Sequence, residues 1–449
     1  MRLLSFRKSC VALLAVWLAA GMAHAEGAAD LVMVGKDGWL FGRHEIPLLA
    51  KKADLEKAER LIARLNQVLA AEHTLLVMAI IPSKIETHAE YLPENFALPA
   101  HVSGWYGGIL ANFRALGVRA VDLKPAMLKA AQDWRVDLPY FKYDTHWTPL
   151  GATVAAWAIR QDLVRQPDVV KALDELKTEK LRLRWQAKAR VGTAPRDLAN
   201  LLPDNERLYP AEAVRRSSLK RMGTKSLIDD ESAEHMALVG SSMSGEGSGF
   251  ADALRYAFQR EVFNYAINAD VGPWVAIRNY LRFVSQKEMT PKLIVWEMPE
   301  RALALLPSDL VRQEQYRMSD TDWLLEVLAY ADRQCKPLPA GPTARAEKVS
   351  ADQSEGLRVV VDAGVPLAYA RIKAEAESLS LVDVEYTGAQ GQKITRQLPL
   401  PGDDASYVLK VPLAVEGQGV REARLVPASG SKLKLESMQT CAYPVPPQP

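Results

Sequence analysis

The sequence predicts an α/β domain with a largely parallel sheet, followed by an all-β module of the sandwich type. Up to residue 334, apolar runs alternate with stretches of helical periodicity, which is the pattern of a parallel sheet covered by helices. From Cys335 onward the apolar stretches are short and are separated by Gly and Pro turns. We therefore divide the chain into residues 1–25, 26–334 and 335–449.

The elements of the α/β domain follow from two local patterns. Continuous apolar runs predict buried strands, and apolar residues at helical spacing predict helices. In chain order, we expect a turn and short strand over 36–41, a helix over 54–72, strands at 75–81 and 118–123, a helix over 149–163, a strand at 237–240, a helix over 250–259, a strand at 261–265, a helix over 273–284 and a strand at 293–297. Thr148 and Pro149 suit the N-cap and first position of their helix.

The C-terminal module shows no helical periodicity. Pro337, Pro339 and Pro342 predict a linker before it. Short alternating stretches predict strands near 357–361, 370–374, 381–386, 407–411, 424–426 and 432–435.

The N-terminus indicates secretion. Arg2, Arg7 and Lys8 precede an apolar run over 11–22, and small residues flank His24 at the end of it. This pattern predicts a signal peptide cleaved after Ala25 and a periplasmic protein. An uncleaved N-terminal anchor is the alternative, although the run is short for a membrane span.

The charge balance limits which classes of partner we expect. Removing residues 1–25 takes three of the 56 basic residues and none of the 54 acidic ones, which leaves 53 against 54. This balance gives no reason to expect nucleic acid as a partner.

Cys335 and Cys441 are the two remaining cysteines, and in an oxidising compartment we expect them to form a disulfide that closes the β module.

Two local signals point to acyl chemistry. Asp144 and His146 stand two apart just before a predicted helix, so the acid can orient the imidazole, although a lone pair of this kind also occurs in capped loops. Ser241 and Ser242 follow a predicted strand, where backbone N–H groups can receive an oxyanion; a simple helix N-cap is the alternative. A serine, a base and an orienting acid together favour nucleophilic catalysis. The histidines form no recognisable metal motif, and we expect neither a metal nor a cofactor.

Asp144-Thr145-His146-Trp147 and Gly240-Ser241-Ser242 resemble the motifs of the SGNH-like alginate O-acetyltransferases of the AlgX and AlgJ type. In that family the acid–histidine pair precedes the serine, as it does here. Further similar segments are 35–41, 81–84, 272–273 and 295–301. The resemblance covers residues 30–330 and extends to the β module, because the AlgX type carries a carbohydrate-binding module with a disulfide there.

The resemblance implies an SGNH-hydrolase-like three-layer domain with Ser242 as nucleophile, His146 as base and Asp144 as orienting acid. It implies Gly272 as an oxyanion donor, while Lys84 and Arg301 are expected either to line the cleft or to form ion pairs. The implied reaction is acetyl transfer through an acyl-serine to an exopolysaccharide such as alginate. The implied partners are a membrane acetyl-donor protein of the MBOAT type and other proteins of an export complex.

Two alternative functions stay open at this point. A polysaccharide acetyl esterase would use the same acyl-enzyme with water as the acceptor. A non-catalytic scaffold would bind polysaccharide through the β module, although all three residue types of a triad are present.

Overall fold

The computed structural model describes residues 30–46, 51–99, 102–133, 137–191, 194–222, 234–267, 272–309, 316–338, 341–351, 354–377, 379–401 and 406–446. The expected signal peptide lies outside these residues. No helix within them is both long enough and apolar enough to cross a membrane.

The α/β domain is built on a five-stranded sheet in which every neighbouring pair is parallel. Its strands, in spatial order, are β4 (Arg119–Ala120), β3 (Leu75–Ile81), β9 (Thr290–Pro299), β7 (Glu234–Gly240) and β8 (Val262–Ala266). The parallel sheet predicted from the apolar runs is confirmed. All strands point the same way, so their carboxyl ends share one edge, where ligand sites open in folds of this class.

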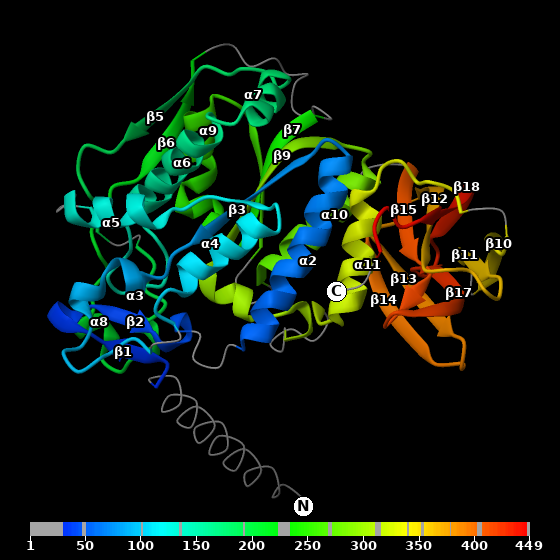
Figure 1. Ribbon diagram of the computed structural model, residues 1–449, viewed down its shortest axis with the longest axis horizontal. Coiled ribbons are helices and arrows are strands. Elements are labelled where there is room, and N and C mark those ends of the chain that lie inside the picture. The colour runs from blue at the N-terminus through cyan, green and yellow to red at the C-terminus, as the bar shows by residue number, and fades with distance from the viewer. Residues whose placement is uncertain are drawn as a thin grey trace, which may run out of the picture.

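Helices cover both faces of this sheet (Figure 1). One face packs against α2 (Lys52–Ala71), α4 (Trp105–Ala115), α10 (Gly272–Gln286) and α11 (Asp320–Ala331). The other packs against α5 (Lys124–Asp133), α6 (Pro149–Leu163), α7 (Pro167–Asp174) and α9 (Phe250–Phe258). The domain therefore has the three-layer fold that the resemblance implies.

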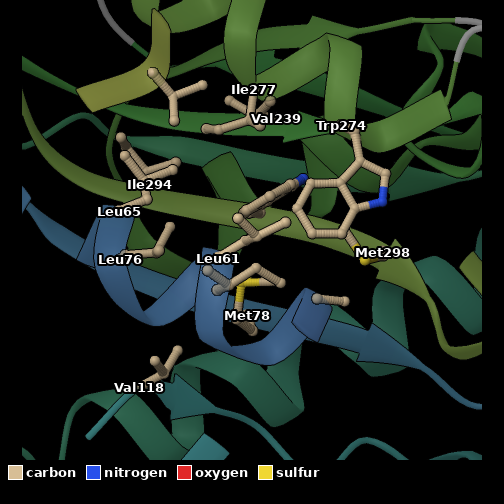
Figure 2. Packing of buried hydrophobic residues seen from close by; sticks show 14 of the residues in the cluster. Leu61, Leu65, Leu76, Met78, Val118, Val239, Trp274, Ile277, Ile294 and Met298 are labelled. Atoms are coloured by element: carbon tan, nitrogen blue, oxygen red, sulfur yellow. The ribbon is translucent and has the colours of Figure 1, made fainter. Parts of the chain in front are cut away.

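Strand β3 shows why the apolar run forms a central strand. Leu76 and Met78 face the α2 side, whereas Val77 and Ala79 belong to the core on the opposite side. Figure 2 shows Leu61 of α2 among the side chains of the first core. Because both faces are covered by helices, both sets of alternating side chains must be apolar.

Shorter elements complete the α/β domain. Two antiparallel pairs are β1 (Val32–Val34) with β2 (Leu40–Gly42) and β5 (Leu181–Trp185) with β6 (Ser217–Arg221). The short helices are α3 (Lys84–Thr87), α8 (Asn205–Leu208), η1 (Lys36–Gly38), η2 (Arg43–Glu45), η3 (Ala89–Tyr91), η4 (Ala199–Leu201), η5 (Ser242–Ser244), η6 (Glu246–Ser248), η7 (Glu300–Ala304) and η8 (Pro307–Asp309).

The C-terminal module is all-β, as predicted. Its strands are β10 (Ala344–Ala351), β11 (Ser354–Val361), β12 (Ala368–Glu377), β13 (Leu381–Gly388), β14 (Lys393–Pro399), β15 (Ser406–Pro412), β16 (Ala414–Val415), β17 (Gln418–Pro427) and β18 (Lys432–Ala442). They form one sheet in the order β14-β13-β17-β11-β18-β12-β15, with β10 on β11 and β16 on β17. Their inward side chains share one apolar core, so the sheet curls around it.

The module is attached to the α/β domain along α11 (Figure 1). Arg396 of β14 donates to Asp322 of α11 at 2.5 Å, and the Tyr369 hydroxyl donates to Asp332 at 2.5 Å. A disulfide joins Cys335, just after α11, to Cys441 in β18. The disulfide expected from the two cysteines is therefore present in the structure.

Candidate active site

The Asp144–His146 segment lies just before α6. The hydroxyl of Thr148 accepts from the N–H of Gly151 at 3.2 Å, so threonine caps this helix as the sequence predicts. Trp147 is buried, and its indole N–H donates to the carbonyl of Met243 at 2.9 Å. This bond ties the histidine segment to the serine turn, which follows β7.

The three residues predicted to form a triad come together. His146 Nδ1 lies 2.6 Å from Asp144 Oδ1, and His146 Nε2 lies 2.8 Å from Ser242 Oγ. A carboxylate beside Nδ1 requires the proton on that nitrogen, so Nε2 accepts from the serine hydroxyl. This is the arrangement in which a histidine can take a proton from serine.

Burial and charge act in opposite directions on this pair. Burial alone raises the pKa of Asp144, but the hydrogen bond and charge of His146 and two backbone N–H donors outweigh it and lower the pKa. Burial lowers the pKa of His146, but the hydrogen bond and charge of Asp144 and the charge of Asp197 raise it overall. The pair therefore favours a charged imidazole beside a carboxylate, which is the state formed when serine loses its proton.

A fully buried carboxylate holds the serine turn. Glu297, near the end of β9, accepts from the N–H of Ser241 at 2.8 Å and from the hydroxyl of Ser244 at 2.9 Å. The Ser241 hydroxyl also donates to Glu297 and caps η5 by accepting from Met243 N at 3.2 Å. A Cβ on Gly240 would lie 2.4 Å from Glu297 Oε2, so only glycine allows the carboxylate this close to the turn.

Glu297 was part of a segment singled out in the sequence, but no role followed from its position there. The available signal was an acidic residue in an otherwise apolar central strand. Such a group is rare unless hydrogen-bonded, so it marks a buried polar contact.

The side chain of Lys84 is fully buried, and the residue lines the same small cavity as Thr145 and Arg301. Its Nζ donates to the carbonyls of Leu40 at 2.5 Å, Lys142 at 3.0 Å and Asp144 at 3.0 Å. Burial lowers the pKa of Lys84 to about 8, against the opposing charge of Glu45. Lys84 thus joins the β1–β2 hairpin to the segment that carries Asp144.

The structure gives less direct information on the predicted roles of Arg301 and Gly272. Arg301 lines a cavity of about 10 Å³ together with Thr145 and Met243, and its charge opposes protonation of His146. Gly272 begins α10 with a φ of 78°, a left-handed conformation that suits glycine. Their roles in the cleft and as an oxyanion donor stay predictions.

Asp197 joins the site without any signal in the sequence. Its backbone N–H donates to Asp144 Oδ2 at 2.7 Å, and its carboxylate lies 3.8 Å from His146 Nδ1. Asp144, His146 and Asp197 each offer an atom within 4.8 Å of the others, as in a metal site. A metal ion on Nδ1 would displace the proton that His146 shares with Asp144, so the contact to Ser242 favours proton transfer as the use of this cluster.

Comparison with known families identifies the α/β domain. Residues 32–300, more than half of the chain, match the SGNH hydrolase-like domain of the acetyltransferase AlgX. The probable alginate O-acetylase AlgJ of Azotobacter vinelandii is 30% identical over 323 residues, covering 68% of this chain and 76% of the relative. The alginate biosynthesis protein AlgX of Pseudomonas aeruginosa is 25% identical over 273 residues, or 58% and 54% of the two chains.

Solved structures agree with this match. The O-acetyltransferase domain of Pseudomonas putida AlgJ superimposes with a TM-score of 0.53 at 27% identity, covering 66% of this chain and 98% of that one. Pseudomonas aeruginosa AlgX superimposes with a TM-score of 0.60 at 19% identity, covering 92% and 94%. The second likeness concerns the fold alone, and it extends over both the α/β domain and the β module.

Proposed function

Because the chain belongs to the AlgX family of acetyltransferases with an SGNH hydrolase-like domain, we propose that it transfers acetyl groups to a bacterial exopolysaccharide through an acyl-serine on Ser242. The observation that carries this proposal is the hydrogen-bonded series from Ser242 Oγ through His146 to Asp144, with distances of 2.8 and 2.6 Å. Alginate is the polymer named for the relatives, and we propose it as the acceptor.

In the first half-reaction, Ser242 Oγ attacks the acetyl carbonyl of the donor while its proton passes to His146 Nε2. The tetrahedral intermediate then expels the donor's leaving group, which takes that proton. Asp144 holds Nδ1–H throughout and stabilises the imidazolium. We assign the oxyanion to the backbone N–H of Ser242 and to the start of α10 at Gly272.

In the second half-reaction, a sugar hydroxyl gives its proton to His146 Nε2 and attacks the acyl carbonyl. The ester bond to the serine breaks, and Ser242 Oγ recovers the proton. Sugar and water compete for the same intermediate, so transfer requires that the acceptor hydroxyl be held near the acyl group. We propose that the β module is a carbohydrate-binding unit that binds the neighbouring sugars of the acceptor chain.

The setting follows from the same proposal. The expected signal peptide would deliver the protein to the periplasm. A membrane protein of the MBOAT type would supply acetyl groups there, and other proteins of the export complex would present the polymer.

The test uses the secreted protein with p-nitrophenyl acetate as donor and defined oligomannuronates as acceptors. Mass spectrometry separates acetylated sugar from free acetate, which distinguishes a transferase from an esterase. Ser242→Ala should lower acetyl transfer by about 10⁴-fold or more while leaving the circular dichroism unchanged. Ser248→Ala is the matched control, because its hydroxyl accepts from the N–H of Phe250 at 3.2 Å rather than contacting His146 or Glu297. Wild-type turnover by Ser242→Ala would show that another residue is the nucleophile.

A further inference from the structure

The segment around Asp197 crosses over the Asp144–His146 segment and is bound to it at several points. Asp197 Oδ1 accepts from the N–H of Thr145 at 2.8 Å, and Oδ2 accepts from the Thr145 hydroxyl. In return, the N–H of Asp197 donates to Asp144 Oδ2 at 2.7 Å. Each acid therefore binds the other's segment, and neither can move without breaking a bond to its partner.

The position of Asp197 is also electrostatic. Its Oδ2 lies 3.8 Å from His146 Nδ1, on the same side of the imidazole as Asp144. This is longer than a hydrogen bond but close enough for a strong charge interaction in a partly buried site. The imidazole thus has two carboxylates beside Nδ1 and the serine hydroxyl at Nε2.

Other charged groups nearby do not replace this contact. The charge of Arg301 acts on His146 with the opposite sign. Lys84 interacts with both acids, and Glu212, which accepts from the N–H groups of Lys142 and Tyr143, interacts with Asp144. Burial and the charge of Asp144 raise the pKa of Asp197 to about 6, so this carboxyl is mostly charged at neutral pH.

We propose that Asp197 is a second positioning acid of the site, which fixes the Asp144–His146 segment and stabilises the imidazolium by its charge. This inference rests on the proposed function, because it needs His146 to act as a base. Asp144 makes the direct hydrogen bond, and Asp197 acts through space and through Thr145.

Asp197→Asn separates charge from geometry. The asparagine keeps its backbone N–H for Asp144 and an oxygen for the N–H of Thr145, but it removes the negative charge. We expect kcat for p-nitrophenyl acetate to fall about 10- to 100-fold with KM unchanged, because the charge is needed mainly once imidazolium forms. Loss of the charge also lowers the pKa of His146, so the acid limb of the pH profile should move to lower pH.

Two variants serve as controls. Thr145→Val removes the hydroxyl that binds Asp197 but keeps the charge, so the acid limb should not move to lower pH. Asp197→Glu keeps the charge as well and should hold the limb near its wild-type position. If Asp197→Asn does not fold by circular dichroism, Asp197→Ser also removes the charge and takes its place.

A second readout does not depend on turnover. The His146 imidazole is titrated by NMR in full-length protein carrying Ser242→Ala, with and without Asp197→Asn. A lower pKa in the double variant supports the proposal, and an unchanged pKa together with kcat within twofold of wild type overturns it. Failure of the proposed function looks different, because Ser242→Ala would then retain turnover whatever residue stands at 197.

Discussion

Replacing Lys84 by methionine removes a buried ammonium group at the point where the β1–β2 hairpin meets the Asp144 segment. Methionine has a similar length and fills the same space, so the change is mainly the loss of charge and donors. The carbonyl oxygens of Leu40 and Asp144 lose their donor, whereas that of Lys142 keeps the N–H of Leu40 at 3.0 Å.

Two opposing contributions set the size of the effect. Burial lowers the pKa of Lys84 from 10.5 to about 8, so removing the charge recovers about 3 kcal/mol. Each buried carbonyl left without a donor costs about 1–3 kcal/mol, or about 4 kcal/mol for two at a middle value. The lost hydrogen bonds therefore outweigh the relief, and we expect the free energy of unfolding to fall by about 1 kcal/mol.

Lys410 offers a matched control in the β module. Its ammonium is also buried, with a pKa lowered to about 8. Among the described residues it donates to two carbonyls, those of Tyr330 and Asp332, so Lys410→Met also leaves two carbonyls without this donor. The same arithmetic gives a loss of about 1 kcal/mol for Lys410→Met.

Urea unfolding followed by tryptophan fluorescence measures both losses, and p-nitrophenyl acetate turnover of the folded variants measures the effect on the site. Lys84→Met should lower turnover at least about 10-fold, because the backbone of Asp144 loses an anchor. Lys410→Met should leave turnover unchanged. The reasoning is wrong if Lys84→Met unfolds at the wild-type urea concentration, or if both variants lose activity equally.

Two further predictions concern protonation and the disulfide. His146 must be neutral to act as a base, and its pKa is raised above 6.5. The value of kcat/KM for p-nitrophenyl acetate should therefore fall as the pH is lowered through that raised pKa. A half-maximal rate below pH 6.5 would contradict this. Mass analysis of the non-reduced protein should find Cys335 joined to Cys441, and replacing both by serine should lower the free energy of unfolding by about 2–4 kcal/mol. Two free thiols in the non-reduced protein would refute the pairing.

The predicted elements of the α/β domain agree with the structure where a helix buries one face or a strand buries both of its faces. Strand β3 has the predicted bounds, Leu75–Ile81, and α6 begins at Pro149 behind its threonine cap. Strand β4 is shorter than the apolar run at 118–123 and covers only Arg119–Ala120. It is an edge strand, so only part of the run is paired.

Some elements carried no usable pattern. Helix α11 is buried on nearly every side, between the parallel sheet and the β module, so its apolar residues show no single face. Strands β10 and β14 lie at edges of the curled sheet. In β14 exposure alternates along the strand, but Arg396 takes an inward position and pairs with Asp322, so the sequence shows no apolar alternation. Helix α4 contains two adjacent glycines, which weaken any helix prediction.

The site was predicted unevenly for a similar reason. Asp144, His146 and Ser242 stand next to a helix cap or the end of a strand, so their neighbours indicate how the chain runs. Asp197 stands in an irregular segment more than fifty residues from the acid that it contacts, and only the folded chain brings the two together. Lysine is usually a surface residue. The burial of Lys84 depends on three carbonyls from distant segments.

The position of β18 has a consequence for the order in which the chain acquires its structure. This strand is the last one among the described residues, yet it lies inside the sheet, between β11 and β12. It pairs with β12 along Ala368–Glu377 but meets β11 only at the pair Glu355–Lys432. Without it, the group β14-β13-β17-β11 would be joined to the pair β12-β15 through Leu413, which accepts from the N–H of Val420 and donates to Ala368. Strand β12 therefore gains this neighbour late in synthesis, and Cys441 arrives in the same strand to meet Cys335. A chain truncated before residue 432 would leave the edge of β12 open, a form prone to aggregation.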